Sequence, residues 1–401
     1  MRVLHVSSEY PPHKVFGLGR YVSDLARELA AQGHEVHVLT NSVGGTDQDH
    51  MDRGVYIHRV DYPPPPMPPT QAAPVAAFNL HLQQRAHALG GGGLGNPELL
   101  VSHDWLTAVA GHHVARRFGI PHVWTVHDTV HGKRFGLVTE TEDRIAFAIE
   151  RWATRTADLV LVNSIAVGDE LSRIYAANPK RMDLLHPGLD VGAAARAQSE
   201  ERLRMFRSIL AGPTEHLVTF AGRLDSEKGV DTLINAFSIV CSQRADVRLA
   251  IAGRGVLQPI VEDHVRKLGL QDAVNLCGYL EGEVLRSFYR VGDVHVCPSH
   301  YEPFGLVALE AMAAGTPVVV SDTGGLRDIV SSTKVGRRVA PRDAEALAGT
   351  LLELLGSPST RRQLAKAGSK HASERFGWPG LARRAAELYS RVLVPKEPVS
   401  V

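Results

Sequence analysis

The chain has 401 residues, of which 44% are hydrophobic and 22% are charged, and its formal net charge is +1 at pH 7. This length is too great for one ordinary α/β core and suits two domains. The near-neutral charge and the 6% aromatic content argue against a nucleic-acid-binding protein and against attraction to an acidic membrane surface.

Short β-branched runs alternate with amphipathic helical patterns through the first half of the chain. The run Val3–Ser7 opens the sequence without a basic and apolar leader, so we expect no signal peptide. No apolar stretch approaches the roughly 20 residues that span a bilayer, so we expect no transmembrane segment. A helical pattern at 20–32 follows the first strand, and such alternation predicts parallel sheets covered by helices. Later strands are expected at 35–40, 55–60, 99–102, 122–126 and 159–162.

A glycine-rich turn follows the first predicted strand. Gly17-Leu18-Gly19 is expected to be a loop that leads into the helix, where backbone N–H groups at a helix N-terminus favour an anion. The dinucleotide motif G-x-G-x-x-G is incomplete, because Val22 lies at the position of its third glycine, and no G-x-x-x-x-G-K-[ST] motif occurs. A dehydrogenase or an NTPase is therefore not expected.

Three stretches interrupt the alternation. Tyr62–Pro69 carries four consecutive prolines and Gly90–Gly93 is a glycine run, so both are expected to be irregular. Residues 190–213 lose strand character and end at Gly212-Pro213, which marks a connector. We therefore expect a first domain at residues 1–192.

The alternation restarts at His216 and predicts a second α/β domain at residues 193–378. A last helical pattern follows Trp378-Pro379, and proline is well placed at a helix start. Residues 379–401 are expected to form a C-terminal helix that could cross back to the first domain. Strands of the second domain are expected at 217–221, 248–252, 273–277, 294–297 and 317–321.

Two cations follow the first strand of this second half. Phe220–Gly229 reads F-A-G-R-L-D-S-E-K-G and places Arg223 and Lys228 five residues apart before the next helix. Two cations beside helix N-termini can neutralise a diphosphate leaving group without a metal. Taken alone, a pair of solvated surface cations is the better interpretation of this segment.

The most specific signal is Glu302–Glu310, which reads E-P-F-G-L-V-A-L-E and follows the strand expected at 294–297. That position is the carboxyl edge, where α/β sheets bind ligands. Eight helical residues span about 12 Å, which is too long for a carboxylate pair acting on one bond. The spacing suits two carboxylates that bind different hydroxyl-bearing parts of one elongated ligand.

Together these two segments resemble the retaining GT-B glycosyltransferases of the large family 4 type, and the resemblance covers nearly the whole chain. It implies an α/β protein with two Rossmann-like domains facing across a cleft. It also implies a nucleotide-diphosphate sugar as co-substrate, a carbohydrate or other hydroxyl acceptor, and no cofactor or metal.

The resemblance assigns roles to residues of the second half. Arg223 and Lys228 would bind the donor diphosphate. Glu302 would face the donor sugar and stabilise positive charge at its anomeric carbon, and Glu310 would hydrogen-bond the ribose. Backbone N–H donors to the sugar and the phosphate would come from Phe304, Gly305 and Leu306.

The first half carries further similarities. His127 in Thr125–Asp128 matches the family's strand-end histidine near the transferred sugar, which implies a catalytic-site residue. His103-Asp104-Trp105 and Lys14–Leu18 resemble the H-D-W and K-x-G-G-L segments of glycogen and starch synthases, with Phe16 in place of the first motif glycine. This favours a glucosyl donor. The same similarity puts Gly17 and Leu18 at the donor, and Lys14, His103 and Asp104 on the acceptor side.

Several alternatives stay open from sequence. One is a mannosyltransferase that uses GDP-mannose, and another is a nucleotide-sugar epimerase or phosphorylase of the same bilobal fold. A non-catalytic sugar-binding protein is a rival of a different class.

Asp47-Gln48-Asp49 fits the D-x-D metal pattern, but a chance acidic loop is the better interpretation. The three cysteines form no C-x-x-C pair, so we expect neither a metal site nor disulfides, and a cytoplasmic location.

Overall fold

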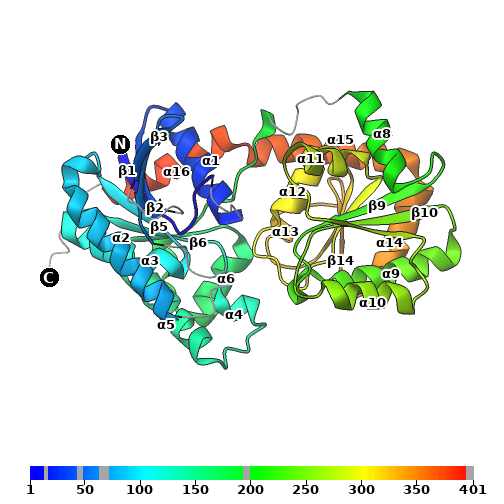
Figure 1. The fold of residues 1–401 in the computed structure, drawn as a ribbon, viewed down its shortest axis with the longest axis horizontal. Helices are drawn as coiled ribbons and strands as arrows, with labels where there is room; N and C mark the ends of the chain where they lie inside the picture. Colours follow the sequence, from blue (N-terminus) through cyan, green and yellow to red (C-terminus); the bar gives the residue numbers. More distant parts are fainter. Residues whose placement is uncertain (13–16, 43–47, 63–71, 193–198, 394–401) are drawn as a thin grey trace. The chain divides into compact units, whose positions relative to one another are not determined.

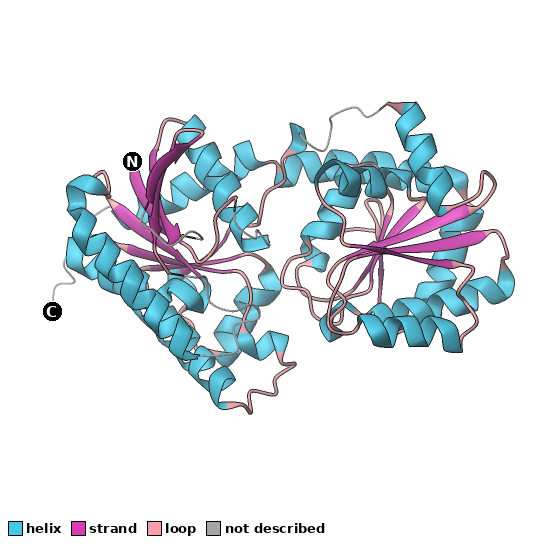
Figure 2. Ribbon diagram, in the orientation of Figure 1, coloured by secondary structure: helices cyan, strands magenta, loops and turns pink. Residues whose placement is uncertain are grey.

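The computed structural model describes residues 1–12, 17–42, 48–62, 72–192 and 199–393. The chain divides into two compact units, Met1–Gly188 with Trp378–Val401, and Leu189–Gly377. Each unit is a mixed α/β body in which helices flank a sheet (Figures 1 and 2). The division falls at Gly188/Leu189, four residues before the boundary expected from sequence, and the last helix, α16, belongs to the first unit.

The first unit is built on an eight-stranded sheet in the order β3-β4-β2-β1-β5-β6-β7-β8. Every neighbouring pair is parallel except β3 with β4. The strands are β1 (Arg2–Val6), β2 (Glu35–Asn41), β3 (Gln48–Asp52), β4 (Val55–Val60), β5 (Leu99–His103), β6 (His122–Val126), β7 (Leu159–Val162) and β8 (Met182–Leu184).

Helices cover both faces of this sheet, because successive strand residues point to opposite faces. Val3 packs into one apolar cluster with α1 and α16, and its neighbour Leu4 packs into another with α2 and α3. The helices are α1 (Gly17–Ala31), α2 (Ala72–Gly93), α3 (Asp104–Phe118), α4 (Val130–Lys133), α5 (Thr141–Thr156), α6 (Ile165–Ile174), the short η1 (Pro179–Arg181) and α16 (Trp378–Leu393).

Two sequence-based expectations for the first unit are wrong. Gly17-Leu18-Gly19 forms the first turn of α1 instead of a loop before it, since Gly19 is buried and Leu18 packs against the core. Gly90–Gly93 ends helix α2, with a kink at Gly90 where φ is 62°. The apolar residues Phe78 and Leu82 hold that helix on the sheet, which outweighs the low helix propensity of its terminal glycines.

The second unit has a six-stranded sheet in the order β11-β10-β9-β12-β13-β14, parallel throughout. Its strands are β9 (His216–Ala221), β10 (Val247–Ala252), β11 (Val274–Gly278), β12 (Val294–Cys297), β13 (Val318–Ser321) and β14 (Arg337–Val339). Its helices are α8 (Glu200–Leu210), η2 (Ser226–Lys228), α9 (Val230–Gln243), α10 (Gln258–Lys267), α11 (Gly282–Val291), α12 (Leu306–Ala313), α13 (Leu326–Ile329), α14 (Ala344–Gly356) and α15 (Pro358–Phe376).

The strand order of the second unit creates a topological switch point. From β9 the chain adds β10 and β11 on one side, and then returns to add β12 on the other side of β9. The loops after β9 and β12 therefore leave the sheet side by side and turn in opposite directions, which is where open α/β sheets bind ligands. In the first unit, β1 lies between β2 and β5 and forms the equivalent point.

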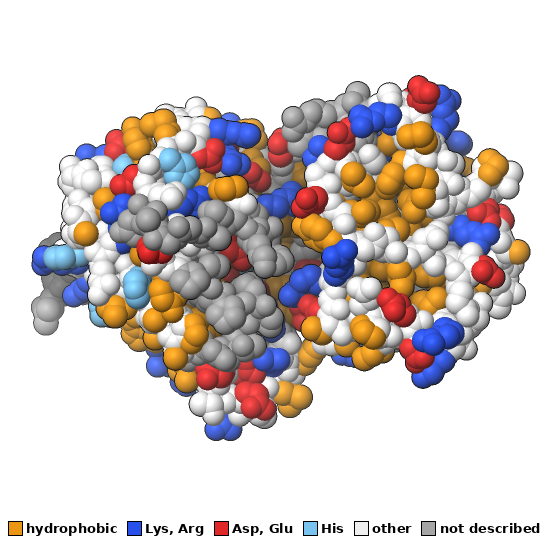
Figure 3. All heavy atoms as spheres, in the orientation of Figure 1, with side chains coloured by type: hydrophobic (Ala, Val, Ile, Leu, Met, Phe, Trp, Pro, Cys, Tyr) orange, Lys and Arg blue, Asp and Glu red, His pale blue; other side chains and the backbone are white. Residues whose placement is uncertain are grey.

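Charged side chains are interspersed over the described surface. On the face drawn in Figure 3, basic and acidic side chains are both scattered over the described surface, in keeping with the formal net charge of +1. Among the described residues, no helix has both the length and the apolar character needed to cross a bilayer.

Candidate functional site

The loops after β9 and β12 are held together through their backbones. The His300 N–H donates to the Glu227 carbonyl at 2.7 Å. Gly229, with φ of 63°, ends η2, and a Cβ atom there would lie 2.1 Å from the Pro298 carbonyl oxygen. Glycine is therefore required at this position. The loops that carry the two predicted motifs pack against each other over the switch point and form one layer of loops.

Lys228 and Glu302 meet in this layer. The Lys228 Nζ lies 2.8 Å from the Glu302 Oε2, and the Ser299 hydroxyl donates to the same oxygen at 3.1 Å. The side chains of Lys228 and Glu302 are only 19% and 16% exposed. An ammonium in such a partly desolvated position interacts more strongly with an anion than a fully solvated one.

Arg223 lies in the same loop but has other partners. Its guanidinium contacts Glu227 at 2.6 Å and Asp225 at 3.2 Å, and its side chain is 49% exposed. Exposed ion pairs of this kind contribute about 0–1 kcal/mol, so a diphosphate with two negative charges can compete for the arginine. The structure thus gives Lys228 a contact with Glu302 and holds Arg223 by acidic residues of its own loop.

Glycines bring a third loop against Glu302. The Gly325 N–H donates to the Glu302 carbonyl at 3.0 Å, and a Cβ atom on Gly324 would lie 1.8 Å from that oxygen. Gly305, with φ of 109°, stands at the N-cap of α12 without a side-chain cap. No side chain among the described residues caps this turn, and the Ala308 N–H donates to the Gly305 carbonyl at 3.0 Å. The N–H groups of Leu306 and Val307 stand before it at the helix N-terminus, where an anion is favoured. Phe304 is buried and anchors this turn, and Leu306 is half-buried.

Glu310 lies inside α12 and is half-buried. Its Oε2 accepts a hydrogen bond from the Tyr289 hydroxyl of α11 at 2.9 Å. Tyr289 thereby fixes the carboxylate that we expect to bind the ribose. Sequence reasoning did not find Tyr289, because its only signal is an aromatic residue at a core position of a helix.

His127 follows β6 in the first unit and is fixed by its backbone. Its N–H donates to the Asp104 Oδ1 at 2.7 Å, and its carbonyl accepts from the Asn163 side-chain amide at 2.6 Å. The Tyr21 ring packs edge-on against the imidazole, with ring centroids 4.5 Å apart. Asp104, His127 and Asn163 follow neighbouring strands β5, β6 and β7 at the carboxyl edge of the sheet. Sequence reasoning missed Asn163, although this residue directly follows β7 just as His127 directly follows β6.

Burial sets the protonation of this group. It lowers the pKa of His127 to about 4, so the imidazole is neutral near pH 7. Burial, with the nearby Asp128 carboxylate, raises the pKa of Asp104 well above its ordinary value. His103 is fully buried, and its two ring nitrogens lie within hydrogen-bond distance of His5 and His127. The acceptor-side roles of His103 and Asp104 stay predictions.

The remaining first-unit candidates lie around α1. Gly17 and Leu18 form its first turn, and the Gly19 N–H donates to the Glu9 Oε2 at 3.2 Å. The chain thus places a carboxylate of its own at this helix N-terminus, where the helix dipole favours negative charge. Lys14 lies outside the described residues.

The D-x-D segment contributes to a strand instead of a loop. Asp49 is in β3 and binds His58 at 2.9 Å and Arg85 at 2.8 Å, while Asp47 lies outside the described residues. Across the part of the chain that the structure describes, no group of three or more His, Cys, Asp or Glu side chains could hold a metal ion.

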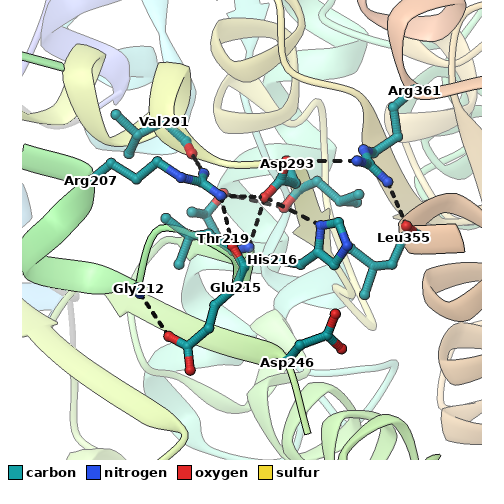
Figure 4. A network of polar contacts seen from close by, with 12 residues as sticks. Arg207, Gly212, Glu215, His216, Thr219, Asp246, Val291, Asp293, Leu355 and Arg361 are labelled. Atoms are coloured by element: carbon teal, nitrogen blue, oxygen red, sulfur yellow. Dashed lines mark hydrogen bonds and ion pairs between the residues drawn. The ribbon is translucent and has the colours of Figure 1, made fainter. Parts of the chain in front are cut away.

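A separate network of ion pairs and hydrogen bonds lies at the amino-terminal edge of the second sheet, opposite the carboxyl edge (Figure 4). Asp293, just before β12, accepts from Arg207 of α8 and from the Leu217 N–H of β9, both at 2.8 Å. Arg361 of α15 lies 3.9 Å from the same carboxylate. These contacts lie at the amino ends of β9 and β12, away from the carboxyl edge, and we assign them to stability of the fold.

Acid is expected to destabilise the protein through its buried histidines. Burial lowers the pKa of His5, His122 and His295 from the ordinary value of 6.5 to about 3. Below pH 6.5 the unfolded chain binds protons that the folded chain does not, so stability falls as the pH drops toward 3. Each such histidine contributes at most about 1.4 kcal/mol per pH unit. Urea denaturation at pH 7.5, 6.5 and 5.5 measures this slope.

Two buried acids, Asp104 and Glu150, oppose this trend because burial raises their pKa values. Burial raises the pKa of Glu150 to about 8, so this carboxyl stabilises the fold as the pH falls from 8 toward its ordinary value of 4.5. The stabilisation by Glu150 offsets the destabilisation by about one buried histidine. We expect H122Q to flatten the acid slope and the exposed-site control H113Q to leave it unchanged. Equal slopes for H122Q and the unsubstituted protein would contradict the burial argument.

Comparisons with known proteins bear on both units. Residues 201–371 match the family model described as Glycosyl transferases group 1, and residues 15–192 match Glycosyltransferase Family 4. Glycogen synthase of Mycobacterium tuberculosis (strain CDC 1551 / Oshkosh) is 34% identical over 402 residues, covering 97% of this chain and 94% of that protein.

Solved structures share the fold. Sucrose-phosphate synthase from Thermosynechococcus elongatus superposes with a TM-score of 0.82 at 26% identity, over 98% of this chain and 99% of that one. The Anabaena protein HepE, solved in complex with UDP-glucose, gives a TM-score of 0.76 at 20% identity, over 97% and 99% of the two chains. The expected α/β class with two Rossmann-like domains of the GT-B type is confirmed.

Proposed function

Because the chain belongs to the glycosyltransferases of group 1 and family 4, we propose that it is a retaining, metal-independent hexosyltransferase. It moves a glucosyl unit from a nucleotide-diphosphate sugar to a hydroxyl of a carbohydrate or related acceptor. The 34% identity to a glycogen synthase supports the choice of glucose over the mannose of a GDP-mannose-dependent enzyme.

One observation carries the proposal. The Lys228 Nζ and the Glu302 Oε2 lie 2.8 Å apart at the switch point of the second unit, beside the uncapped N-terminus of α12. A cation and free backbone N–H groups bind phosphate oxygens, and a carboxylate binds sugar hydroxyls. A nucleotide-diphosphate sugar presents these two kinds of group next to each other.

The charges of these residues suit departure of a diphosphate. As the bond from the anomeric carbon to the phosphate oxygen breaks, negative charge grows on the phosphate and positive charge grows on the sugar. Lys228 and Arg223 stabilise the first, and Glu302 stabilises the second. We propose that the leaving phosphate oxygen takes the proton of the acceptor hydroxyl on the same face of the sugar, which retains the anomeric configuration.

R223A is expected to lower turnover about 10- to 100-fold, since it removes one cation from the leaving group. Its Tm should change little, because the arginine is 49% exposed and its described ion pairs are with Asp225 and Glu227 of its own loop. Steady-state kinetics and thermal melts measure both effects. R362A, at an exposed arginine of α15, is the matched control, and unchanged kinetics in R223A would remove Arg223 from the mechanism.

Transfer of labelled sugar from a panel of donors tests the function. UDP-, ADP- and GDP-glucose and GDP-mannose are each supplied with a glucan or with a hexose phosphate as acceptor. We expect one glucosyl donor to be used, an α-linked product from an α-linked donor by NMR, and full rate in EDTA. Inversion, loss of rate in EDTA, preference for GDP-mannose, or donor epimerisation without transfer would each contradict the corresponding part of the proposal.

A further inference from the structure

Three imidazoles form a hydrogen-bonded chain across the first sheet. His5 lies in β1, His103 ends the neighbouring β5, and His127 follows β6. The Nδ1 of His5 is 3.1 Å from the Nε2 of His103, and the Nδ1 of His103 is 3.2 Å from the Nε2 of His127. The chain thus runs from the buried centre of the sheet to the half-buried His127.

Such a chain can take only two proton arrangements when every ring is neutral. A neutral imidazole has one N–H donor and one acceptor nitrogen. The two hydrogen bonds must therefore point the same way along the chain. Either all three rings carry the proton on Nδ1, or all three carry it on Nε2.

Burial keeps the rings neutral. It lowers the pKa of His5 to about 3 and that of His127 to about 4, and it lowers the pKa of His103 well below its ordinary value. His103 also faces the other two histidines, which disfavours a positive charge on it further. Near pH 7 the two proton arrangements are therefore the relevant ones.

The buried end of the chain selects between them. The Nε2 of His5 is buried without a hydrogen-bond partner among the described residues. With protons on Nε2, this atom would be an orphaned buried N–H donor, which folded proteins avoid more strictly than an unpaired acceptor. With protons on Nδ1, every N–H inside the chain is used, and only a lone pair at the buried end is left.

We propose that His5 and His103 are positioning residues that hold the proton of His127 on Nδ1, so that this ring nitrogen donates a hydrogen bond to a hydroxyl of the transferred sugar. This inference rests on the proposed contact of His127 with that sugar. The contacts of the His127 backbone with Asp104 and Asn163 keep the ring at the end of the histidine chain.

NMR of the full chain labelled with 15N-histidine reads the tautomers directly. Long-range 1H–15N spectra at pH 7.5 should show protonated Nδ1 and unprotonated Nε2 atoms for His5, His103 and His127. A proton on the Nε2 of His127 in the wild-type protein would overturn the inference. This readout needs no activity, so it separates failure of the inference from failure of the proposed transferase function.

A pair of variants at His5 tests the consequence for catalysis. In H5N the side-chain amide can place an N–H near the position of Nδ1, whereas H5L removes the donor to His103. We expect H5L to lower kcat about tenfold with little change in the donor KM, because supporting residues act through orientation, and H5N to restore most of the rate. The His127 spectrum should become a mixture of tautomers in H5L alone.

Two results would count against this role. Equal losses of kcat in H5N and H5L would indicate a packing role for His5, and a normal kcat with an unchanged His127 spectrum in H5L would remove His5 from the chain's function. If neither variant folds, the wild-type tautomers alone decide. Absence of sugar transfer in the wild-type protein, with Nδ1 protons in place, would refute the proposed function and leave the tautomer assignment standing.

Discussion

K228A is expected to lower kcat/KM for the nucleotide sugar by about 10²–10³, which is the effect of removing one strong donor from a developing negative charge. The ammonium is only 19% exposed and lies 2.8 Å from Glu302, so its loss also leaves that carboxylate with Ser299 as its described partner. A negative carboxylate without its cation repels the diphosphate. The loss should therefore appear in both kcat and KM.

K366A provides the control for this experiment, because Lys366 is an exposed lysine on α15 of the same unit. Its kinetics should match those of the unsubstituted protein. K228R keeps the charge and should recover part of the lost rate, since a guanidinium also binds phosphate. A K228A variant with a normal kcat/KM and an unchanged Tm would show that Lys228 does not bind the donor.

G324A is expected to destabilise the second unit by about 2–4 kcal/mol and to reduce activity strongly. The φ of Gly324 is 50°, and an added Cβ would lie 1.8 Å from the Glu302 carbonyl oxygen, so the backbone must move. That movement breaks the hydrogen bond from the Gly325 N–H and shifts Glu302 relative to Lys228. A Tm fall of roughly 5–15 °C corresponds to this loss for a unit of this size.

G349A is the matched control, because Gly349 lies inside α14 with open space around the added Cβ. Alanine has a higher helix propensity than glycine, so the free energy of unfolding of this variant should rise by about 0.5–1 kcal/mol. Thermal melts and transfer assays on both variants compare the two sites. Near-normal activity and stability in G324A would mean that the loops around Glu302 do not need their close packing.

Much of the fold could be predicted because its strands are short buried runs bounded by polar turns. The β9, β10, β12 and β13 strands lie close to their expected ranges. The β3 strand was missed because its residues, Q-D-H-M-D, are almost entirely exposed and carry no hydrophobic alternation. Helix α2 was missed because it ends in glycines, and packing on the sheet overrode their weak propensity.

The candidate site was predictable where a motif is contiguous. The segments around Lys228 and Glu302 could be identified from spacing, and the structure brings these two side chains together. Arg223 instead contacts Asp225 and Glu227 of its own loop. Spacing alone cannot reveal which of several nearby charges a flexible side chain meets.

Contacts between residues far apart in the chain could not be predicted from the sequence for a different reason. Gly324 reaches Glu302 only because β12 and β13 are neighbours, and His5 reaches His103 only because β1 and β5 are. Nothing in the intervening sequence marks either pair. Once the strand order is known, both follow from the rule that parallel strands end at the same edge of a sheet.

In the proposed function, Arg223 and Lys228 bind the diphosphate of the donor. Calorimetric titration of UDP, ADP and GDP into the unsubstituted protein and into the double variant R223A/K228A tests it most directly. We predict that one nucleotide binds the unsubstituted protein, and that the double variant, with an unchanged fold by circular dichroism, binds it at least about 100-fold more weakly. Equal affinity of that nucleotide for both proteins would contradict the claim.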